Sequence, residues 1–592
     1  MSSFTPVTEI ANLPRRPSAL HVLRQHAAER PGREAVTFIR DHDNPDGSDT
    51  LTYSQLDSEA RRVGSWLQDR CQPGDRVLLV YPPGLGFVTA FSGCMYAGVV
   101  AVPAPVPGRY KHHQRRLSGM VTDAGARIAL TDTSQLAEVR RWSAGYAPEL
   151  AAFATDDPNL GDPSAWREPP AAARSLVLLQ YTSGSTGDPK GVMVHHGNLL
   201  HNADSFRRTL GLDGQTRFGG WIPLYHDMGL LTQLMPALLF GSACVLMSPE
   251  AFLKRPHVWL SAIDQHGLNF SAAPNFAYEL CVRKIDESLT ADLDLSRWRF
   301  ALNGSEPIQA STLRDFAERF AANGFRAEAF APSYGMAEAT VYVSGSTGRP
   351  LVVEQADPQA LEKNDIRPPE PGDSAREIVS CGFTTEFDLR IVDQDTGRVL
   401  PDGVTGEIWL RGASVAVGYW GRDDATEKTF QARTADGDGP YLRSGDLGAV
   451  IRGELYVTGR IKDLLIVHGR NLYPHDIEHE LRLAHPELAT LAGAVVSVAA
   501  PDEQVVVMHE IRGRHSDERL REIIGGMRAT VSREFGVRAA GVLLLRPGAV
   551  RRTTSGKIQR AEMRNLLLRG DLTPVYQEFE PEPRAVLDGG RA

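Results

Sequence analysis

The sequence has few of the features that mark secreted, membrane-spanning or nucleic-acid-binding proteins. Its five cysteines stand alone, without the spacing of a disulfide framework or a metal site, so we expect them to be buried. No run approaches the ~18 uncharged apolar residues of a membrane span, and residues 1–16 lack the apolar core of a signal peptide. The 64 basic and 73 acidic residues are dispersed and give a net charge of −9. We therefore expect a cytoplasmic protein with no membrane span and no nucleic-acid partner.

Length and pattern indicate the fold class. A chain of 592 residues is too long for one core, so we expect at least two domains. Short apolar runs such as residues 76–80 and 99–102 alternate with helical stretches such as residues 87–98. Strands that alternate with helices are typical of an α/β architecture with largely parallel sheets. The tail from Thr573 is charged and rich in proline, and we expect it to be mobile.

The most informative stretch is residues 179–191, Leu-Gln-Tyr-Thr-Ser-Gly-Ser-Thr-Gly-Asp-Pro-Lys-Gly. An apolar run at residues 175–179 predicts a buried strand that ends in this loop. Glycines let backbone N–H groups approach an anion closely, hydroxyl side chains add donors, and Lys190 adds a positive charge. The spacing is not that of a Walker A loop. The loop therefore predicts a phosphate site of another kind, with an ordinary Ser/Gly connection as the alternative.

The order of glycines, hydroxyl residues and lysine in residues 179–191 resembles the phosphate loop of the adenylate-forming superfamily. This superfamily includes acyl-CoA synthetases, luciferases and the adenylation domains of peptide synthetases. Matching motifs continue from Tyr181 to Lys557, so the resemblance covers most of the chain. It implies a large N-terminal adenylating domain, residues 1–460, with mixed sheets flanked by helices and a β-rich subdomain. It also implies a small mobile C-terminal α+β domain, residues 461–592, that carries the catalytic lysine.

The resemblance implies an ATP site built from four separate motifs. The turn after residue 302 would receive adenine, Tyr334 would stack on it, and Asp446 would accept hydrogen bonds from the ribose hydroxyls. The alternative for Asp446 is an ordinary Gly-Asp turn. The predicted ATP-binding residues are Thr182, Ser183, Gly184, Ser185, Thr186, Gly187, Lys190, Asn303, Gly304, Ser305, Tyr334, Gly335, Met336, Asp446 and Arg460.

The same resemblance assigns the catalytic roles. Lys557, in Thr-Ser-Gly-Lys, matches the catalytic lysine, and Arg460 would reach the ribose or the α-phosphate. Lys462 would be the hinge between the domains. His226, in Tyr-His-Asp-Met-Gly, would position the reacting carboxylate; a fatty carboxylate is ionised at neutral pH and needs no base. The alternatives are a solvated surface lysine for Lys557 and a hydrogen-bonded structural histidine for His226.

Glu338, in Ser-Tyr-Gly-Met-Ala-Glu, matches the residue that holds magnesium in the superfamily. One carboxylate suffices, because Mg²⁺ keeps waters and phosphate oxygens among its ligands. The alternative is a solvated surface glutamate. The sequence departs from the superfamily at Ala337, where many members have threonine. In this respect it resembles fatty acyl-AMP ligases, which usually have alanine there.

Three candidates for the acyl pocket are Asp227, Met228 and Phe276, beside an apolar stretch at residues 230–239 that suits a lipid tail. Core packing is an equally good interpretation of Phe276 and its neighbour Tyr278. An acidic side chain for a substrate amine is not evident there, which disfavours an amino-acid adenylating enzyme.

Residues 341–380 form a long polar connection, and fatty acyl-AMP ligases carry an insertion in this part of the chain. In that family the insertion is thought to restrain the C-terminal domain and to disfavour coenzyme A; the alternative is a disordered surface loop. The sequence therefore resembles a fatty acyl-AMP ligase that uses ATP and Mg²⁺ and passes a fatty acid to an acyl carrier protein or a polyketide synthase carrier domain. The alternatives are a long-chain acyl-CoA synthetase and an idle binding protein, although the latter predicts decayed motifs.

Overall fold

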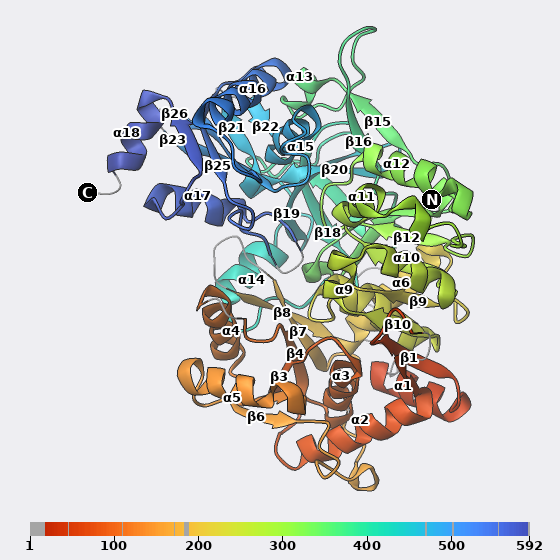
Figure 1. Cartoon of the computed structure of the whole chain (residues 1–592). Coiled ribbons are helices and arrows are strands. Elements are labelled where there is room, and N and C mark those ends of the chain that lie inside the picture. The colour runs from red at the N-terminus through yellow and green to blue at the C-terminus, as the bar shows by residue number, and fades with distance from the viewer. Residues whose placement is uncertain are drawn as a thin grey trace.

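The computed structural model describes residues 18–44, 47–108, 111–170, 172–182, 189–467, 470–499, 503–553 and 556–589. Figure 1 shows the chain running from the red N-terminal elements to the blue C-terminal ones. The helices of the described part are α1 (Ala19–Glu29), α2 (Tyr53–Gln68), α3 (Leu85–Ala97), α4 (Lys111–Ala124), α5 (Thr133–Tyr146), α6 (His196–Leu210), α7 (Asp227–Gly229), α8 (Met235–Phe240), α9 (Pro249–Lys254), α10 (His257–Gln265), α11 (Asn275–Lys284), α12 (Ala310–Phe320), α13 (Pro358–Leu361), α14 (Asp423–Phe430), α15 (Pro474–Ala484), α16 (Asp517–Phe535), α17 (Arg560–Arg569) and α18 (Pro581–Gly589).

The predicted phosphate loop connects two strands of a six-stranded sheet. The order of this sheet is β6 (Ala151–Ala154), β5 (Ile128–Thr131), β3 (Arg76–Val80), β4 (Val100–Ala104), β7 (Leu176–Thr182) and β8 (Lys190–His195). All neighbours are parallel except the hairpin β7–β8, in which Thr182 pairs with Lys190. The predicted strands at residues 76–80 and 175–179 and the helix at residues 87–98 are thus confirmed within a few residues.

An eight-stranded sheet carries the predicted adenine turn. Its order is β14 (Tyr342–Gly345), β13 (Phe330–Gly335), β12 (Phe300–Asn303), β11 (Phe270–Ala273), β9 (Phe218–Gly220), β10 (Cys244–Met247), β1 (Glu34–Ile39) and β2 (Ser48–Thr52). The inner pairs are parallel, and the two edge pairs, β13–β14 and β1–β2, are antiparallel. Parallel inner strands place the ends of β12 and β13 at the same edge of the sheet, which brings two predicted ATP motifs together.

A four-stranded antiparallel sheet forms the predicted β-rich part and brings in the ribose motif. Its order is β17 (Asp388–Val392), β18 (Gly406–Arg411), β19 (Leu442–Ile451) and β20 (Glu454–Arg460). Residues 341–380 are ordered and not a loose loop, because β15 (Val353–Ala356) and β16 (Arg376–Val379) pair as a hairpin around α13. Apolar side chains of this segment pack on the antiparallel sheet: Ala356, Leu361, Ile366 and Ile378 against Leu447, Ala449 and Tyr456.

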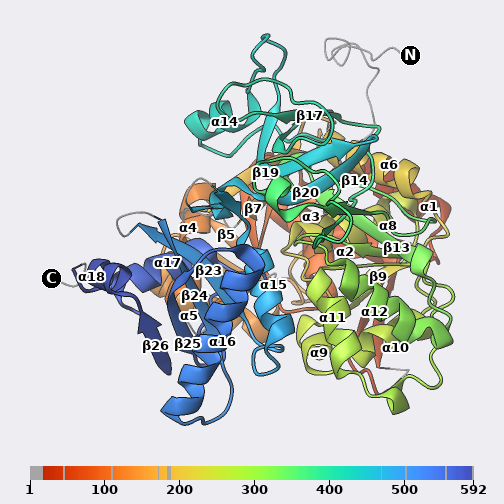
Figure 2. The same cartoon turned by 90° about the horizontal axis from the view of Figure 1, so that it is seen from above.

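The C-terminal elements are gathered at one side of the molecule in both Figure 1 and Figure 2. They comprise the hairpin β21 (Leu465–Val467) and β22 (Arg470–Leu472) and a mixed sheet in the order β23 (Gly493–Ala499), β24 (Glu503–Glu510), β25 (Ala539–Leu545) and β26 (Tyr576–Phe579). The prediction of a mobile tail from Thr573 is wrong. Tyr576 to Phe579 add an edge strand to β25, and α18 follows. Backbone hydrogen bonds to β25 give this polar segment an order that its composition does not suggest.

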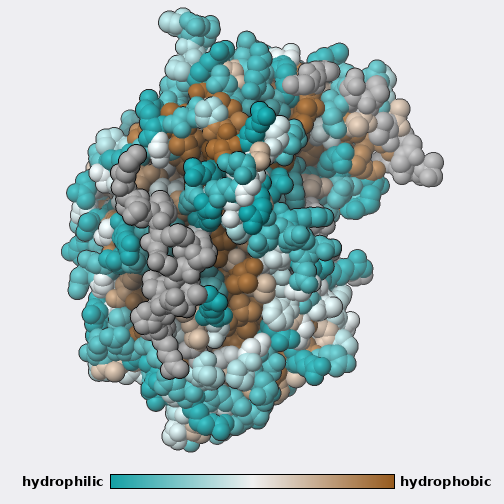
Figure 3. Space-filling view, turned by 180° about the vertical axis from the view of Figure 1, so that it is seen from behind, coloured by the Kyte–Doolittle hydropathy of each residue, from teal (hydrophilic) through white to brown (hydrophobic). Residues whose placement is uncertain are grey.

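The buried core contains the apolar side chains and all five cysteines, as predicted. Figure 3 shows a largely hydrophilic face on which apolar side chains gather in hollows between more polar regions. Among the described residues, no helix is long and apolar enough to cross a membrane. The apolar clusters of residues 465–587 contain only C-terminal side chains, so this part has a core of its own.

Candidate active site

A cavity of about 1040 Å³ lies where the eight-stranded sheet, the antiparallel sheet and the C-terminal part meet. Seven of the predicted site residues line it: Ser305, Tyr334, Gly335, Asp446, Arg460, Lys557 and Phe276. They come from segments separated by up to 281 residues (557 − 276). The fold thus assembles one site from motifs that the sequence shows as separate signals.

Asp446 is the centre of a hydrogen-bonded network in this cavity. Its Oδ2 accepts from the Tyr334 hydroxyl at 2.8 Å, and its Oδ1 accepts from Arg460 Nε at 3.0 Å. The pairing of β19 with β20 places residue 446 opposite residue 460. The Asp446 carboxylate raises the pKa of Arg460, and burial raises the pKa of Tyr334 well above its ordinary value. The carboxylate is therefore held in place as an acceptor, with a cation and a phenol beside it.

The predicted adenine turn follows β12 directly. Asn303 is fully buried, and Ser305 has a backbone φ of +74°, a conformation that side chains other than glycine rarely adopt. A Cβ on Gly304 would lie 2.8 Å from the Ser333 carbonyl oxygen, so the absence of a side chain there lets β12 approach β13. The turn is therefore strained at Ser305 and packed tightly against β13.

Lys557 lies on the loop between β25 and α17 and faces the same cavity. Burial is the main cause of the lowered Lys557 pKa, and the Arg460 guanidinium lowers it further. The negative charges of Asp227, Asp446 and Glu306 partly offset this lowering. Glu306 is partly buried, and this desolvation raises its pKa; its Oε1 accepts from the Phe276 N–H at 2.6 Å. The alternative of a solvated surface lysine is excluded by this position in the cavity.

Glu338 lies in the 3₁₀ turn Ala337–Ala339, and its Oε1 accepts from the Tyr419 hydroxyl at 2.8 Å. Burial raises the pKa of Glu338, and the charge of Asp227 raises it further, whereas the Tyr419 bond and Arg460 lower it. Tyr419 also lies under the Lys190 ammonium, 4.9 Å from the ring centroid. A tyrosine in Gly-Tyr-Trp predicts only packing, so sequence reasoning missed this contact between two motifs.

His226 precedes the short helix α7, and its imidazole is held neutral because burial lowers its pKa to about 4. Asp227 raises this pKa, whereas Lys557 and Arg116 lower it. A neutral imidazole can donate or accept a hydrogen bond at pH 7 but does not supply a positive charge.

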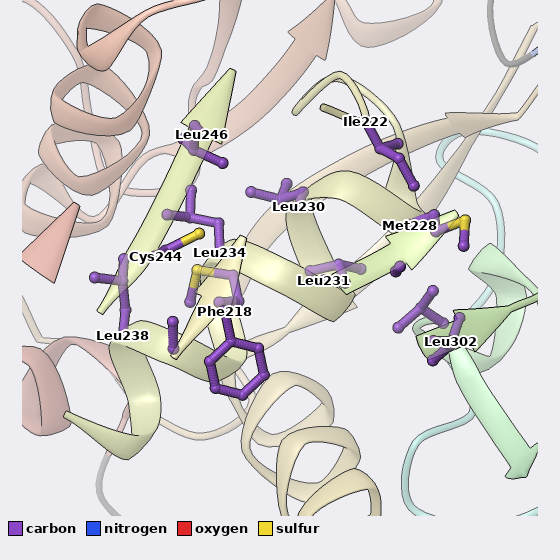
Figure 4. Close-up of a cluster of buried hydrophobic side chains, with 14 of the residues drawn as sticks. Phe218, Ile222, Met228, Leu230, Leu231, Leu234, Leu238, Cys244, Leu246 and Leu302 are labelled. Carbon is purple, nitrogen blue, oxygen red and sulfur yellow. The ribbon is translucent and has the colours of Figure 1, made fainter. Parts of the chain in front are cut away.

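The apolar stretch after His226 is the π-helical turn Leu230–Leu234 followed by α8. Figure 4 shows Met228 facing Leu302, while leucines of the turn and α8 pack against β9 and β10. Met228 is 7% exposed. Tyr278 is fully buried and donates to the Leu302 carbonyl, so core packing is the correct interpretation of Tyr278, whereas Phe276 lines the cavity.

The remaining predicted residues do not line this cavity or lie outside the described part of the chain. Lys190 and Thr182 flank the loop tip, and Lys462 is exposed in the 3₁₀ turn Ile461–Asp463. The Tyr334 hydroxyl is 3.8 Å from the sulfur of Met336. The loop residues Ser183, Gly184, Ser185, Thr186 and Gly187 lie outside the described residues.

Comparison with known proteins shows the family of the chain. Residues 23–420 match the family described as AMP-binding enzyme. A curated medium-chain-fatty-acid–[acyl-carrier-protein] ligase, JamA of Moorena producens, is 38% identical over 93% of this chain and 95% of its own length. A long-chain-fatty-acid–AMP ligase, FadD26 of Mycobacterium marinum, is 37% identical over 91% of this chain and 95% of its own length. The solved structure of a fatty acyl-adenylate ligase from L. pneumophila with acyl adenylate and pyrophosphate has a TM-score of 0.74 and 34% identity, with 95% of this chain and 98% of that chain covered.

Proposed function

This chain belongs to the AMP-binding enzymes and, among them, to the fatty acyl-AMP ligases, and from that premise we propose a two-step reaction. It activates a fatty acid with ATP to an acyl-adenylate and pyrophosphate. It then transfers the acyl group to the phosphopantetheine thiol of an acyl carrier protein or a polyketide synthase carrier domain. The observation that carries the proposal is the meeting of Lys557 with the Tyr334–Asp446–Arg460 network in one cavity.

The first step follows from the charges of the cavity. The ribose hydroxyls donate to Asp446, and the adenine lies between Tyr334 and the turn at Ser305. When the fatty carboxylate attacks the α-phosphate, negative charge is concentrated where Lys557 and Arg460 face the cavity. Preorganised positive charge at that point stabilises the transition state without reorganisation. Neutral His226 positions the carboxylate and adds no charge of its own.

Magnesium fits at Glu338. Burial is the main cause of the raised Glu338 pKa, and the charge of Asp227 raises it further; a cation at Glu338 would offset both effects. When bound there, Mg²⁺ would neutralise charge on the phosphates of ATP. The neutral variant Glu338→Gln should raise the Mg²⁺ concentration for half-maximal pyrophosphate release roughly tenfold, since a charge-assisted contact contributes about 1.5 kcal/mol or more. An unchanged Mg²⁺ titration would place the metal elsewhere.

The second step needs a domain movement. We propose that residues 1–460 form the adenylating domain and 461–592 the mobile one, with the exposed Lys462 as the hinge. The support is the separate apolar core from residue 465 onward and the position of Lys462 in a short turn between the two parts. Rotation about such a hinge would withdraw Lys557 and admit an acceptor thiol.

Two charged pairs, Glu362–Arg470 and Arg376–Asp476, join the 341–380 segment to the C-terminal part. Glu362 accepts from Arg470 in bidentate fashion, at 2.7 Å from Nε and 2.5 Å from Nη2. Arg376 pairs with Asp476 and lies over the Tyr473 ring, 5.2 Å from its centroid. These contacts support a role for the segment in limiting movement and thereby the choice of acceptor.

If these two charged pairs limit the choice of acceptor, the double variant Glu362→Gln/Arg376→Gln should form acyl-coenzyme A about tenfold or more faster than wild type. Each broken charge-assisted contact is worth about 1.5–3 kcal/mol. Acyl-adenylate formation should stay within about twofold. The matched control is Arg367→Gln, because Arg367 is 63% exposed and, among the residues that the structure describes, pairs only with carboxylates of its own segment. Equal rates of coenzyme A acylation by wild type, control and double variant would show that these charged pairs do not limit the choice of acceptor.

The transfer step is tested with purified protein, ATP, Mg²⁺ and a panel of fatty acids. We expect fatty-acid-dependent pyrophosphate release, and acyl mass on holo carrier protein but not on apo carrier protein, which lacks the thiol. Absence of pyrophosphate release with every fatty acid would overturn the adenylation step. Release without carrier acylation would overturn only the acceptor.

A further inference from the structure

One face of α4 runs along the hairpin that carries the phosphate loop. Asp123 Oδ2 accepts from the hydroxyl of Tyr181, just before the loop, at 2.7 Å. One turn earlier, a Cβ on Gly119 would lie 3.3 Å from Pro189, just after the loop. Residues three and four apart share a helix face, so the next position on this face is Arg116. It lies about 10 Å along the axis from Asp123, beyond the paired end of the hairpin, on the side of the loop tip.

The Arg116 side chain is partly buried, and burial lowers its pKa. Its charge acts on Tyr225 and on His226, the residue assigned to the reacting carboxylate. Burial is the main cause of the raised Tyr225 pKa and of the lowered His226 pKa, and the Arg116 charge shifts both pKa values downward. Within the described part of the chain, the guanidinium makes no ion pair or hydrogen bond. Such a cation is costly to hold without an anion. Its position therefore calls for a charged partner that arrives with the substrates.

We propose that Arg116 binds the β- and γ-phosphates of ATP and the pyrophosphate that they become. The guanidinium fork matches phosphate oxygens in bidentate fashion, and it keeps its charge at any pH the enzyme meets. Lys190 at the base of the loop and Arg116 on α4 then flank the leaving group, while Lys557 and Arg460 serve the α-phosphate. The proposal goes beyond the reaction itself, since it assigns a residue outside all the motifs to the departing group.

The test is ATP–pyrophosphate exchange with Arg116→Gln, which removes the charge and keeps a polar side chain of similar reach. We expect the KM for pyrophosphate and the KM for ATP to rise about tenfold or more, as for a lost charged hydrogen bond. Arg116→Lys should recover part of this effect. The neighbouring Arg115→Gln is the matched control, because Arg115 is exposed and should leave both constants unchanged. Acyl transfer from supplied acyl-adenylate, which involves no pyrophosphate, should be unchanged in all variants.

Three results would overturn the proposal. A rise confined to the KM for the fatty acid would mean that Arg116 serves the carboxylate. The same loss in Asp188→Asn, with no further loss in the double variant, would make that loop carboxylate its partner. Unchanged constants in both Arg116 variants would leave it without a role toward phosphate. Thermal unfolding of each variant is measured alongside, and if Arg116→Gln does not fold, the KM values of Arg116→Lys decide.

Discussion

Replacing Lys557 by alanine should slow acyl-adenylate formation roughly 100- to 1000-fold, the largest catalytic effect that we expect from one substitution. Lys557 lines the cavity and is acted on by the charges of Arg460, Asp227, Asp446 and Glu306; under the proposed reaction its own charge stabilises the reacting α-phosphate. Loss of one preorganised donor costs about 2.7–4 kcal/mol of transition-state stabilisation. Single-turnover measurement of acyl-adenylate from ATP and a fatty acid gives the rate directly.

Two controls make this result specific. Arg546→Ala removes an exposed cation from the same loop, outside the cavity lining, and should leave adenylation within about threefold of wild type. Transfer from supplied acyl-adenylate to the acceptor thiol should continue in Lys557→Ala, because the proposed domain rotation withdraws Lys557 from the cavity before the thiol attacks. An adenylation rate within threefold of wild type would remove Lys557 from the catalytic role.

The Lys557 environment also predicts a pH dependence. Its pKa is lowered from its ordinary value, and the ammonium form is present only below that pKa. The kcat/KM for ATP reports the ionisation of the free enzyme. It should therefore decline as the pH rises, and the decline should begin at a lower pH than the one at which an ordinary lysine loses its proton.

Replacing Arg560 by methionine should destabilise the C-terminal part by about 3–5 kcal/mol, the usual cost of leaving a buried charge unpaired. Arg560 holds Glu478 in bidentate fashion, at 2.8 Å from Nε and 2.7 Å from Nη2, and Asp463 at 3.0 Å. Glu478 is 3% exposed. The contacts join α17, α15 and the turn that carries Lys462, so both the core and the placement of the Lys557 loop depend on them. Urea unfolding followed by fluorescence measures the loss.

The same helix offers the control. Arg569 pairs with Asp571 at 2.9 Å, but the two side chains are 55% and 54% exposed. Arg569→Gln should therefore change the free energy of unfolding by less than about 1 kcal/mol. The double variant Arg560→Met/Glu478→Gln should be more stable than Arg560→Met, because the buried charge is gone and Gln still accepts from the Val495 N–H. Equal losses in Arg560→Met and Arg569→Gln would refute the buried-pair explanation.

Much of the fold could be predicted because its signals are local. The side chain of Thr52 accepts from the Gln55 N–H and caps the start of α2, a signal within four residues of sequence. The apolar run at residues 76–80 is β3, and residues 516–535 contain α16. The tail from Thr573 could not be predicted, since β26 is stabilised by hydrogen bonds to β25, about 30 residues earlier in the chain. A polar edge strand has no period that marks it before its partner is known.

The site shows the same limit. The cavity collects four residues that lie in recognisable sequence motifs: Tyr334, Asp446, Arg460 and Lys557. Tyr419 reaches Glu338 from a loop 81 residues later, and nothing in its own neighbourhood indicates this. Arg116 lies in a helix with no motif, and only the packing of α4 on the hairpin reveals its position.

The acceptor decides the central claim, so the most direct measurement offers coenzyme A and holo acyl carrier protein to the enzyme in one reaction. Purified protein, ATP, Mg²⁺ and a fatty acid are mixed with both thiols at equal concentration, and the products are followed by mass. We predict acyl-adenylate at early times and thioester on the carrier alone. Efficient formation of acyl-coenzyme A would contradict the account, since the 341–380 segment would then not exclude this acceptor and the protein would act as an acyl-CoA synthetase.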